Sequence, residues 1–133
     1  MKRRQKFNAR PAYIGARKFD SELEATCWAL AYAVEQANPG VLVVELKPRF
    51  LLLSAQTLPS GRKERASHYT ADFALHLKRK GIRVVIEVKS AATKAEPAYI
   101  LRRKLLYFIH KVEVVEVTCM AALQTLLRNL LRA

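Results

Sequence analysis

The segment Val84–Lys89 places a carboxylate and a lysine in a run of otherwise apolar, β-branched residues. Side chains alternate between the two faces of an extended strand, so Glu87 and Lys89 share one face while Ile86 and Val88 point to the other. Charged side chains in such a strand are costly to bury unless they are paired or have a chemical task. The pattern therefore indicates either a reactive site or an ordinary cross-strand ion pair.

A second carboxylate, Asp72, is predicted to lie directly opposite Glu87. If residues 78–81 form the turn of a hairpin that closes with glycine, Leu77 pairs with Ile82, and the same register pairs Asp72 with Glu87. Cross-strand partners hold their Cβ atoms roughly 4.5–5.5 Å apart. Two like charges at that distance are unfavourable unless a cation lies between them, and Mg²⁺ or Mn²⁺ prefers such oxygen ligands. With this register, a metal site is the simplest explanation.

A third carboxylate can come from a helix predicted over 21–37, which ends at Asn38-Pro39-Gly40. Glu24 borders the apolar stripe of this helix and could reach the sheet, whereas Glu22 lies on the solvent side. Ser21 and Glu24 also have the spacing of a capping box, an alternative role that is hard to combine with a catalytic one. The apolar stripe consists of Leu23, Cys27, Leu30 and Val34.

Together these motifs resemble the PD-(D/E)XK nuclease superfamily. Tyr69–Phe73 (YTADF) followed by Glu87-Val88-Lys89 is similar to its signature, with Ala71 in the place of the name-giving proline. Phe19–Ala25 and Leu46–Phe50 are similar to small phage-encoded nucleases of this superfamily and to the catalytic domain of transposon end-cleaving endonucleases. The resemblance covers roughly residues 19–117.

The resemblance implies hydrolysis of phosphodiester bonds by water activated by Mg²⁺ or Mn²⁺. It implies that Asp72, Glu87 and the Val88 carbonyl bind one or two ions, and that Glu24 completes the ligands or binds a second ion. Lys89 would orient the attacking water or stabilise charge on the phosphorus. The implied catalytic residues are thus Glu24, Asp72, Glu87 and Lys89.

The charge of the chain predicts a polyanionic partner. The 133 residues contain 24 Lys and Arg against 11 Asp and Glu, a net charge of +13. A basic excess of this size is typical of nucleic-acid-binding domains, although solubility and binding to a membrane surface are alternatives. No segment has the roughly 20 apolar residues of a membrane span, so we expect DNA rather than a membrane. The candidate DNA contacts are Lys2, Arg3, Arg4, Arg62, Lys63, Arg102 and Arg103.

The elements that must position these residues predict an α/β fold, a mixed central sheet flanked by helices with a restriction-endonuclease-like core. Strands are expected over 41–46, 49–53, 68–77, 82–90 and 112–117, and further helices over 96–110 and 120–133. The connection from 82 to 117 should be a parallel crossover. Residues 1–18 are expected to form a flexible basic arm, 19–133 one nuclease domain, and 58–67 a basic surface loop.

The sequence thus favours a metal-dependent DNA endonuclease acting in the cytoplasm of a bacterial or phage-infected cell. It could be selective for Holliday junctions or other branched DNA. Alternatives are a transposon-end-type subunit that needs a recombination or transposition partner, and a non-catalytic basic DNA-binding module. The leucine-rich last helix predicts either a homodimer interface or burial within the monomer.

Overall fold

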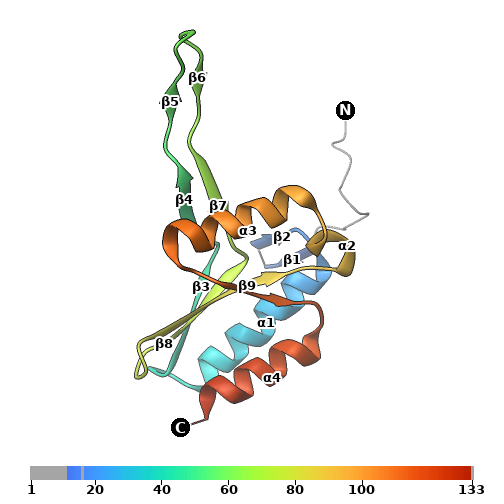
Figure 1. Cartoon of the computed structure of the whole chain (residues 1–133). Helices are drawn as coiled ribbons and strands as arrows, with labels where there is room; N and C mark the ends of the chain where they lie inside the picture. Colours follow the sequence, from blue (N-terminus) through green and yellow to red (C-terminus); the bar gives the residue numbers. More distant parts are fainter. Residues whose placement is uncertain (1–11, 16, 133) are drawn as a thin grey trace.

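The computed structural model of the protein describes residues 12–15 and 17–132. Its centre is a four-stranded mixed sheet with the strand order β10-β9-β8-β3, which confirms the predicted fold class (Figure 1). The strands are β3 (Leu42–Leu46), β8 (Phe73–Leu77), β9 (Ile82–Val88) and β10 (Val114–Val117). The pairs β3–β8 and β8–β9 are antiparallel, whereas β9–β10 is parallel, as expected for a crossover connection.

The β8–β9 hairpin has the predicted register. Leu77 pairs with Ile82, and the ladder continues in step to Phe73 and Ile86. Residues 78–81 form the turn, and Gly81 adopts a positive φ of 62°, which glycine accepts without steric cost. Asp72 and Glu87 therefore come next to each other, one position beyond the end of the ladder.

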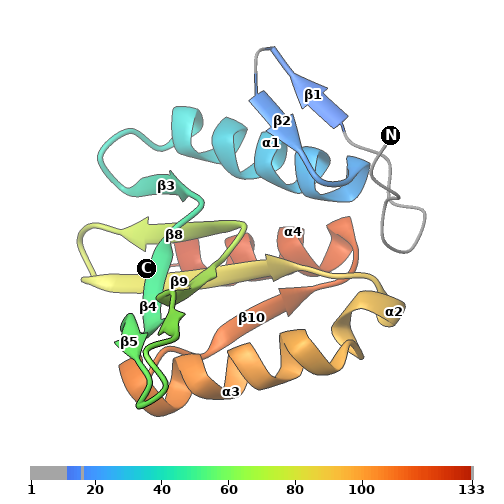
Figure 2. The ribbon, with the colours of Figure 1, turned by 90° about the horizontal axis from the view of Figure 1, so that it is seen from above.

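Helices cover both faces of the sheet (Figure 2). Helices α1 (Glu22–Ala37) and α4 (Met120–Leu131) pack on one face, and α3 (Pro97–His110) lies on the other. The first face buries the larger apolar core, which includes Ile86 and Val88 of β9. The second face buries Val85 together with Leu106 of α3. By strand alternation Glu87 and Lys89 belong to this second face.

The strand predicted over 68–77 is interrupted. It divides into β7 (Ser67–Thr70) and β8, with Ala71 and Asp72 between them. Strand β7 leaves the central sheet and pairs with β4 (Arg49–Leu53). The chain beyond this pair continues into a second short pair, β5 (Gln56–Thr57) with β6 (Lys63–Glu64). The predicted surface loop at 58–67 is therefore the end of a long hairpin that rises away from the body (Figure 1).

The expectation of a basic arm over residues 1–18 is wrong for its last part. Strands β1 (Ala12–Ile14) and β2 (Arg17–Phe19) form an antiparallel pair that packs on α1. Gly15 lies in the turn of this hairpin with a φ of 59°, which glycine adopts without steric cost. Lys2, Arg3 and Arg4 lie outside the described residues. A short helix, α2 (Ala91–Lys94), also follows β9 where none was predicted.

The leucines of α4 are used within the chain. Leu123 and Leu127 are buried in the main core, and Leu126, Leu130 and Leu131 pack against it half-buried. Burial within the monomer thus accounts for the apolar face of α4, and homodimerisation stays a prediction. Among the described residues, none of the helices has the length and apolar content that crossing a membrane requires.

Candidate active site

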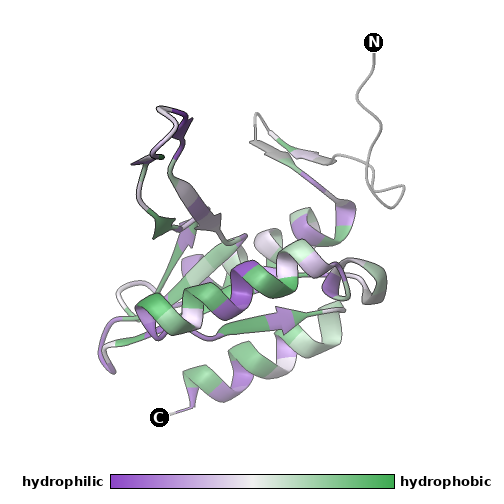
Figure 3. Ribbon diagram, turned by 45° about the horizontal axis from the view of Figure 1, so that its top comes forward, coloured by the Kyte–Doolittle hydropathy of each residue, from purple (hydrophilic) through white to green (hydrophobic). Residues whose placement is uncertain are grey.

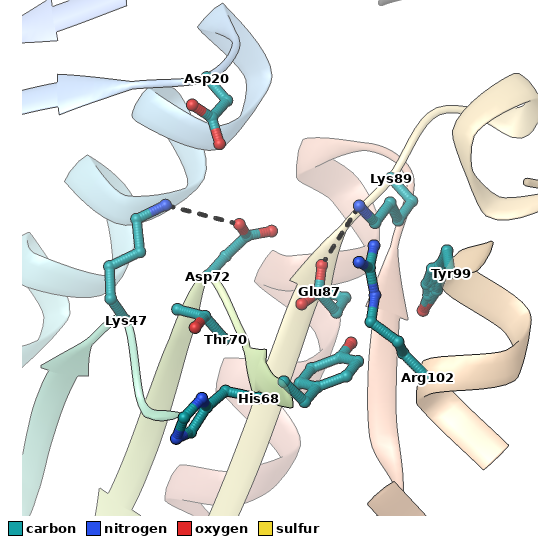
Figure 4. Close-up of a pocket in the computed structure, with 10 residues that line it drawn as sticks. Asp20, Lys47, His68, Thr70, Asp72, Glu87, Lys89, Tyr99 and Arg102 are labelled. Atoms are coloured by element: carbon teal, nitrogen blue, oxygen red, sulfur yellow. Dashed lines mark ion pairs between the residues drawn. The ribbon is translucent and has the colours of Figure 1, made fainter. Parts of the chain in front are cut away.

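A pocket opens where β7, β8 and β9 meet α3 (Figure 4). It contains three of the four predicted catalytic residues, Asp72, Glu87 and Lys89. Glu24 lines an adjoining depression that shares Asp72 and Lys89 with this pocket. The remaining wall of the pocket is formed by Asp20, Lys47, His68, Tyr69, Thr70, Tyr99 and Arg102.

Asp72 occupies the break between β7 and β8. Its backbone amide still donates to the Ile86 carbonyl at 3.2 Å, and its carboxylate Oδ2 accepts a bond of 2.6 Å from the Val88 amide. Burial, followed by the charges of Glu87 and Glu24, raises the pKa of Asp72 well above its usual range. The Val88 amide and the Lys47 ammonium act in the opposite direction but are weaker. The negative form of Asp72 is thus held in a place where additional positive charge would stabilise it.

Glu87 of β9 is buried, with 4 % of its surface exposed. Burial raises its pKa, although the Lys89 ammonium, 3.6 Å from the carboxylate, lowers it in part. The Tyr69 ring lies beside Glu87, and burial together with the Glu87 charge raises the pKa of the Tyr69 phenol. Tyr69 therefore stays protonated and can act only as a neutral neighbour of this carboxylate.

The side chain of Lys89 is held between the pocket and α3. Its ammonium lies 4.8 Å from the centre of the Tyr99 ring, a favourable cation–π geometry. Among the described residues, the buried hydroxyl groups of Tyr69 and Tyr99 lack hydrogen-bond partners of ordinary geometry. Burial raises the pKa of Tyr99 to about 12. Both phenols therefore stay protonated and line the pocket as neutral groups.

Lys47 belongs to this site, although its place between the strands predicted over 41–46 and 49–53 did not indicate a role there. It has a φ of 50° in the turn between β3 and β4, and its amide donates to the Asp72 carbonyl. Its ammonium lies 2.6 Å from Glu24 Oε1 and 3.8 Å from Asp72 Oδ1. Burial alone would lower the pKa of Lys47, but its bond to Glu24 raises it. Lys47 thus connects the helix carboxylate to the sheet carboxylate.

Glu24 takes part in the N-terminal cap of α1, whose N-cap residue is Ser21, and also lies beside the site. Its amide donates to Ser21 Oγ at 3.1 Å, while its Oε2 accepts from the Asp20 amide and its Oε1 from Lys47. Glu24 therefore combines capping contacts with a place beside the site, and its catalytic role stays a prediction. Glu24 is 3 % exposed, whereas Glu22 is exposed to solvent, as the helix geometry predicted.

The predicted DNA-contact residues separate into distinct places. Arg102 lines the pocket, but Arg103 turns away and bonds Glu116 of β10 at 2.6 Å. Arg62 and Lys63 lie at the end of the long hairpin and are exposed. Arg102 is thus the one of the two neighbouring arginines that a ligand in the pocket would meet.

The donor set fits a divalent cation that shares its ligands with a substrate. Within the described part of the chain, no three His, Cys, Asp or Glu side chains are grouped closely enough to hold a metal ion by themselves. Mg²⁺ is commonly held by one or two carboxylates and completed by water and phosphate oxygens. Asp72 and Glu87 supply such a pair, and each already has a lysine ammonium next to it (Figure 4).

Comparison with known proteins gives a family without an assigned activity. No curated protein and no solved structure matches this chain. The family model described as "Protein of unknown function (DUF1064)" matches residues 4–125. This match includes every residue of the site described above. The chain therefore belongs to the DUF1064 family.

Proposed function

We propose that this protein is a metal-dependent DNA endonuclease of the PD-(D/E)XK type. The observation that carries the proposal is the meeting of Asp72 and Glu87 at the end of the β8–β9 ladder, with Lys89 on the same face. Both carboxyls have raised pKa values because they are buried and repel negative charge. This arrangement is unfavourable for the apoprotein and favourable for binding a cation, as expected of a functional site.

Asp72, Glu87 and the carbonyl of Val88 would hold the cation. Bound there, Mg²⁺ or Mn²⁺ would polarise a phosphate and lower the pKa of a water molecule. The Val88 amide orients Asp72 through its bond to Oδ2, which leaves Oδ1 directed toward Lys47 and the pocket. The ligands are thus positioned by the backbone of the sheet rather than by flexible loops.

Lys89 and Lys47 have different tasks in this proposal. Lys89 is the catalytic lysine, because it lines the pocket with its ammonium 3.6 Å from Glu87, where it can orient water or stabilise charge on a phosphate. Lys47 is a positioning residue, because its ammonium lies between the carboxylates of Glu24 and Asp72 and interacts with both. The direct binding of metal by Glu24 stays a prediction, and the contacts favour an action through Lys47.

DNA is the proposed substrate, with the net charge of +13 as its support. Branched DNA such as a Holliday junction is the preferred form, in a phage or mobile-element setting in the cytoplasm. A homodimer would allow paired cuts in two strands. These finer assignments rest on the resemblance of residues 19–117 to small phage-encoded nucleases and transposon end-cleaving endonucleases.

The test is cleavage of supercoiled plasmid and of a four-way junction in Mg²⁺ by the wild type, Glu87→Ala and Glu22→Gln. The wild type and Glu22→Gln, an exposed control on α1, should cut, and Glu87→Ala should not. Faster cutting of the junction than of a linear duplex would support the preference for branched DNA. Tight binding without cutting by any of the three, in Mg²⁺ or Mn²⁺, would instead favour a DNA-binding module or a partner-dependent subunit.

A further inference from the structure

A long two-stranded arm, residues 49–70, projects from the body of the protein (Figures 1 and 3), and residues at its base line the pocket. The arm consists of the pairs β4–β7 and β5–β6, and its turn is closed by bonds of 2.8 Å between Leu58 and Arg62 and between Gly61 and Leu58. Every residue over 53–67 is exposed apart from Leu58 and Ala66, which are half-buried. The outer part of the arm therefore contributes little to the core, and stability of the domain does not explain its presence.

The outer arm is hydrophilic and basic. Its end appears among the most hydrophilic parts of the ribbon in Figure 3. Arg62, Lys63 and Arg65 are all exposed, and Glu64 supplies the opposing charge through an ion pair with Arg62. This pair is 3.1 Å long with both side chains largely in solvent, so a phosphate could replace Glu64 at small cost.

The same strand that carries the arm leads into the proposed active site. Strand β7 ends at Thr70, two residues before Asp72, and both His68 and Thr70 line the pocket. At the base of the arm, Arg49 of β4 lies 3.0 Å from the Nδ1 atom of His68. A polyanion bound in the pocket would therefore also lie close to the base of the arm.

The dimensions of the arm match a DNA groove. An extended strand advances about 3.3 Å per residue, so the nine residue-to-residue steps from Gly61 to Thr70 span roughly 30 Å. One turn of B-DNA is about 34 Å long, and its major groove, about 12 Å wide, admits a two-stranded β-ribbon. The major groove of A-form RNA is too deep and narrow for such an element.

We propose that the arm lies in the major groove of duplex DNA beside the cleavage site, where Arg62, Lys63 and Arg65 contact backbone phosphates. The choice of DNA rests on the proposed function, whereas the role of the arm rests on its shape, exposure and charge. The protein thus requires a stretch of intact duplex next to the bond it cuts. Contacts to phosphates make this recognition independent of sequence.

Two variants test the arm separately from cleavage. In one, residues 54–66 are replaced by Asn-Gly, which joins the paired residues Leu53 and Ser67 through a two-residue hairpin turn. In the other, Arg62, Lys63 and Arg65 are changed to Gln. The control changes Lys78, Arg79 and Arg128 to Gln, an equal loss of charge on exposed positions of the β8–β9 turn and α4. Circular dichroism first establishes that each variant folds.

Binding to a 30-base-pair duplex is measured in EDTA over a range of salt concentrations, so that no DNA is cut. Each lost phosphate contact lowers the slope of log Kd against log salt concentration by about 0.9. Both arm variants lose three basic residues, so their slopes should be lower than that of the wild type by about 3. Their Kd should rise by at least about tenfold, while the control slope changes by less than about 1. Slopes of the arm variants equal to that of the control would overturn the inference.

A duplex RNA of the same sequence gives the second comparison. The wild type and the arm variants should bind it alike, and an equal loss for RNA and DNA would overturn the groove assignment. If DNA binding depends on the arm but the protein never cuts DNA, the proposed role of the arm is supported and the proposed nuclease activity is rejected. If the protein cuts DNA in Mg²⁺ and its binding does not depend on the arm, the proposed role of the arm is rejected and the proposed nuclease activity is retained.

Discussion

The carboxylate of Asp72 accepts a hydrogen bond from the backbone amide of Val88, with 2.6 Å between Oδ2 and the nitrogen. The bond lies at the position where the β8–β9 ladder would otherwise continue, because Phe73 and Ile86 are its last paired residues. A side chain thus replaces a backbone partner at the point where β7 diverges from β8. The hydrogen bond from Val88 to the Asp72 carboxylate therefore accounts both for the break in the strand and for the orientation of the carboxylate.

Asp72→Asn should make the metal-free protein more stable at neutral pH. The folded pKa of Asp72 is raised, so the group favours folding while protonated, below its unfolded pKa of about 3.9, and disfavours it as pH rises through the folded pKa. Asparagine keeps an oxygen that can accept from Val88 but carries no charge. At pH 7.5 in EDTA we expect a Tm about 3–5 °C higher than that of the wild type, equivalent to ~1 kcal/mol.

Two conditions check this explanation by differential scanning fluorimetry. The advantage of Asp72→Asn should shrink as pH falls toward 4, because the wild-type carboxyl then becomes neutral as well. Millimolar Mg²⁺ should raise the Tm of the wild type and leave that of the variant unchanged. A variant that is less stable than the wild type at every pH would show that the Asp72 charge is already compensated without metal.

Lys47→Met should destabilise the fold because it leaves Glu24 buried without its ammonium partner. Lys47 is 40 % exposed, so solvent screening reduces the loss to about 1–2 kcal/mol, less than for a fully buried pair. Combining Lys47→Met with Glu24→Gln should recover part of the loss in urea denaturation. The exposed Arg62–Glu64 pair is the control, and Arg62→Ala should cost at most about 0.5 kcal/mol. Strictly additive effects of Lys47→Met and Glu24→Gln would contradict the proposed coupling.

Arg102→Ala and Arg103→Ala should have opposite phenotypes although the residues are adjacent. Arg102 lines the pocket, so its loss should weaken binding to duplex DNA by about tenfold with little change in Tm. Arg103 bonds Glu116 and lies 5.5 Å from the centre of the Tyr99 ring, so its loss should lower the Tm by a few degrees and leave affinity nearly unchanged. Fluorescence anisotropy and thermal melts distinguish the two. Equal losses of affinity would show that both arginines contact DNA.

Much of the site follows from local sequence rules. The turn at 78–81 sets the hairpin register, and this register alone brings Asp72 beside Glu87. The angle of Glu24 on its helix likewise indicates that it, and not Glu22, faces the sheet. These relationships depend on short segments with strong periodicity, in which the position of one residue sets the positions of its neighbours.

The parts that could not be predicted depend on contacts between distant segments. Lys47 reaches Glu24 and Asp72 because a backbone turn with positive φ directs it there, and no spacing in the sequence indicates this. The break at Asp72 depends on the side-chain bond to Val88. The outer arm has polar residues without alternation, so its sequence is typical of a loop, and its strands form through their mutual pairing.

The role of Glu87 in a metal-dependent nuclease site is tested by the rate at which supercoiled plasmid is nicked in Mg²⁺ by the wild type and by Glu87→Gln. Both are compared at protein concentrations that saturate the DNA, which separates chemistry from binding. We expect metal-dependent nicking by the wild type and a loss of at least about 100-fold for Glu87→Gln, a variant that removes one negative ligand and keeps the shape of the side chain. Equal rates for the two proteins, or nicking by the wild type that persists in EDTA, would contradict a metal-dependent nuclease site at Glu87.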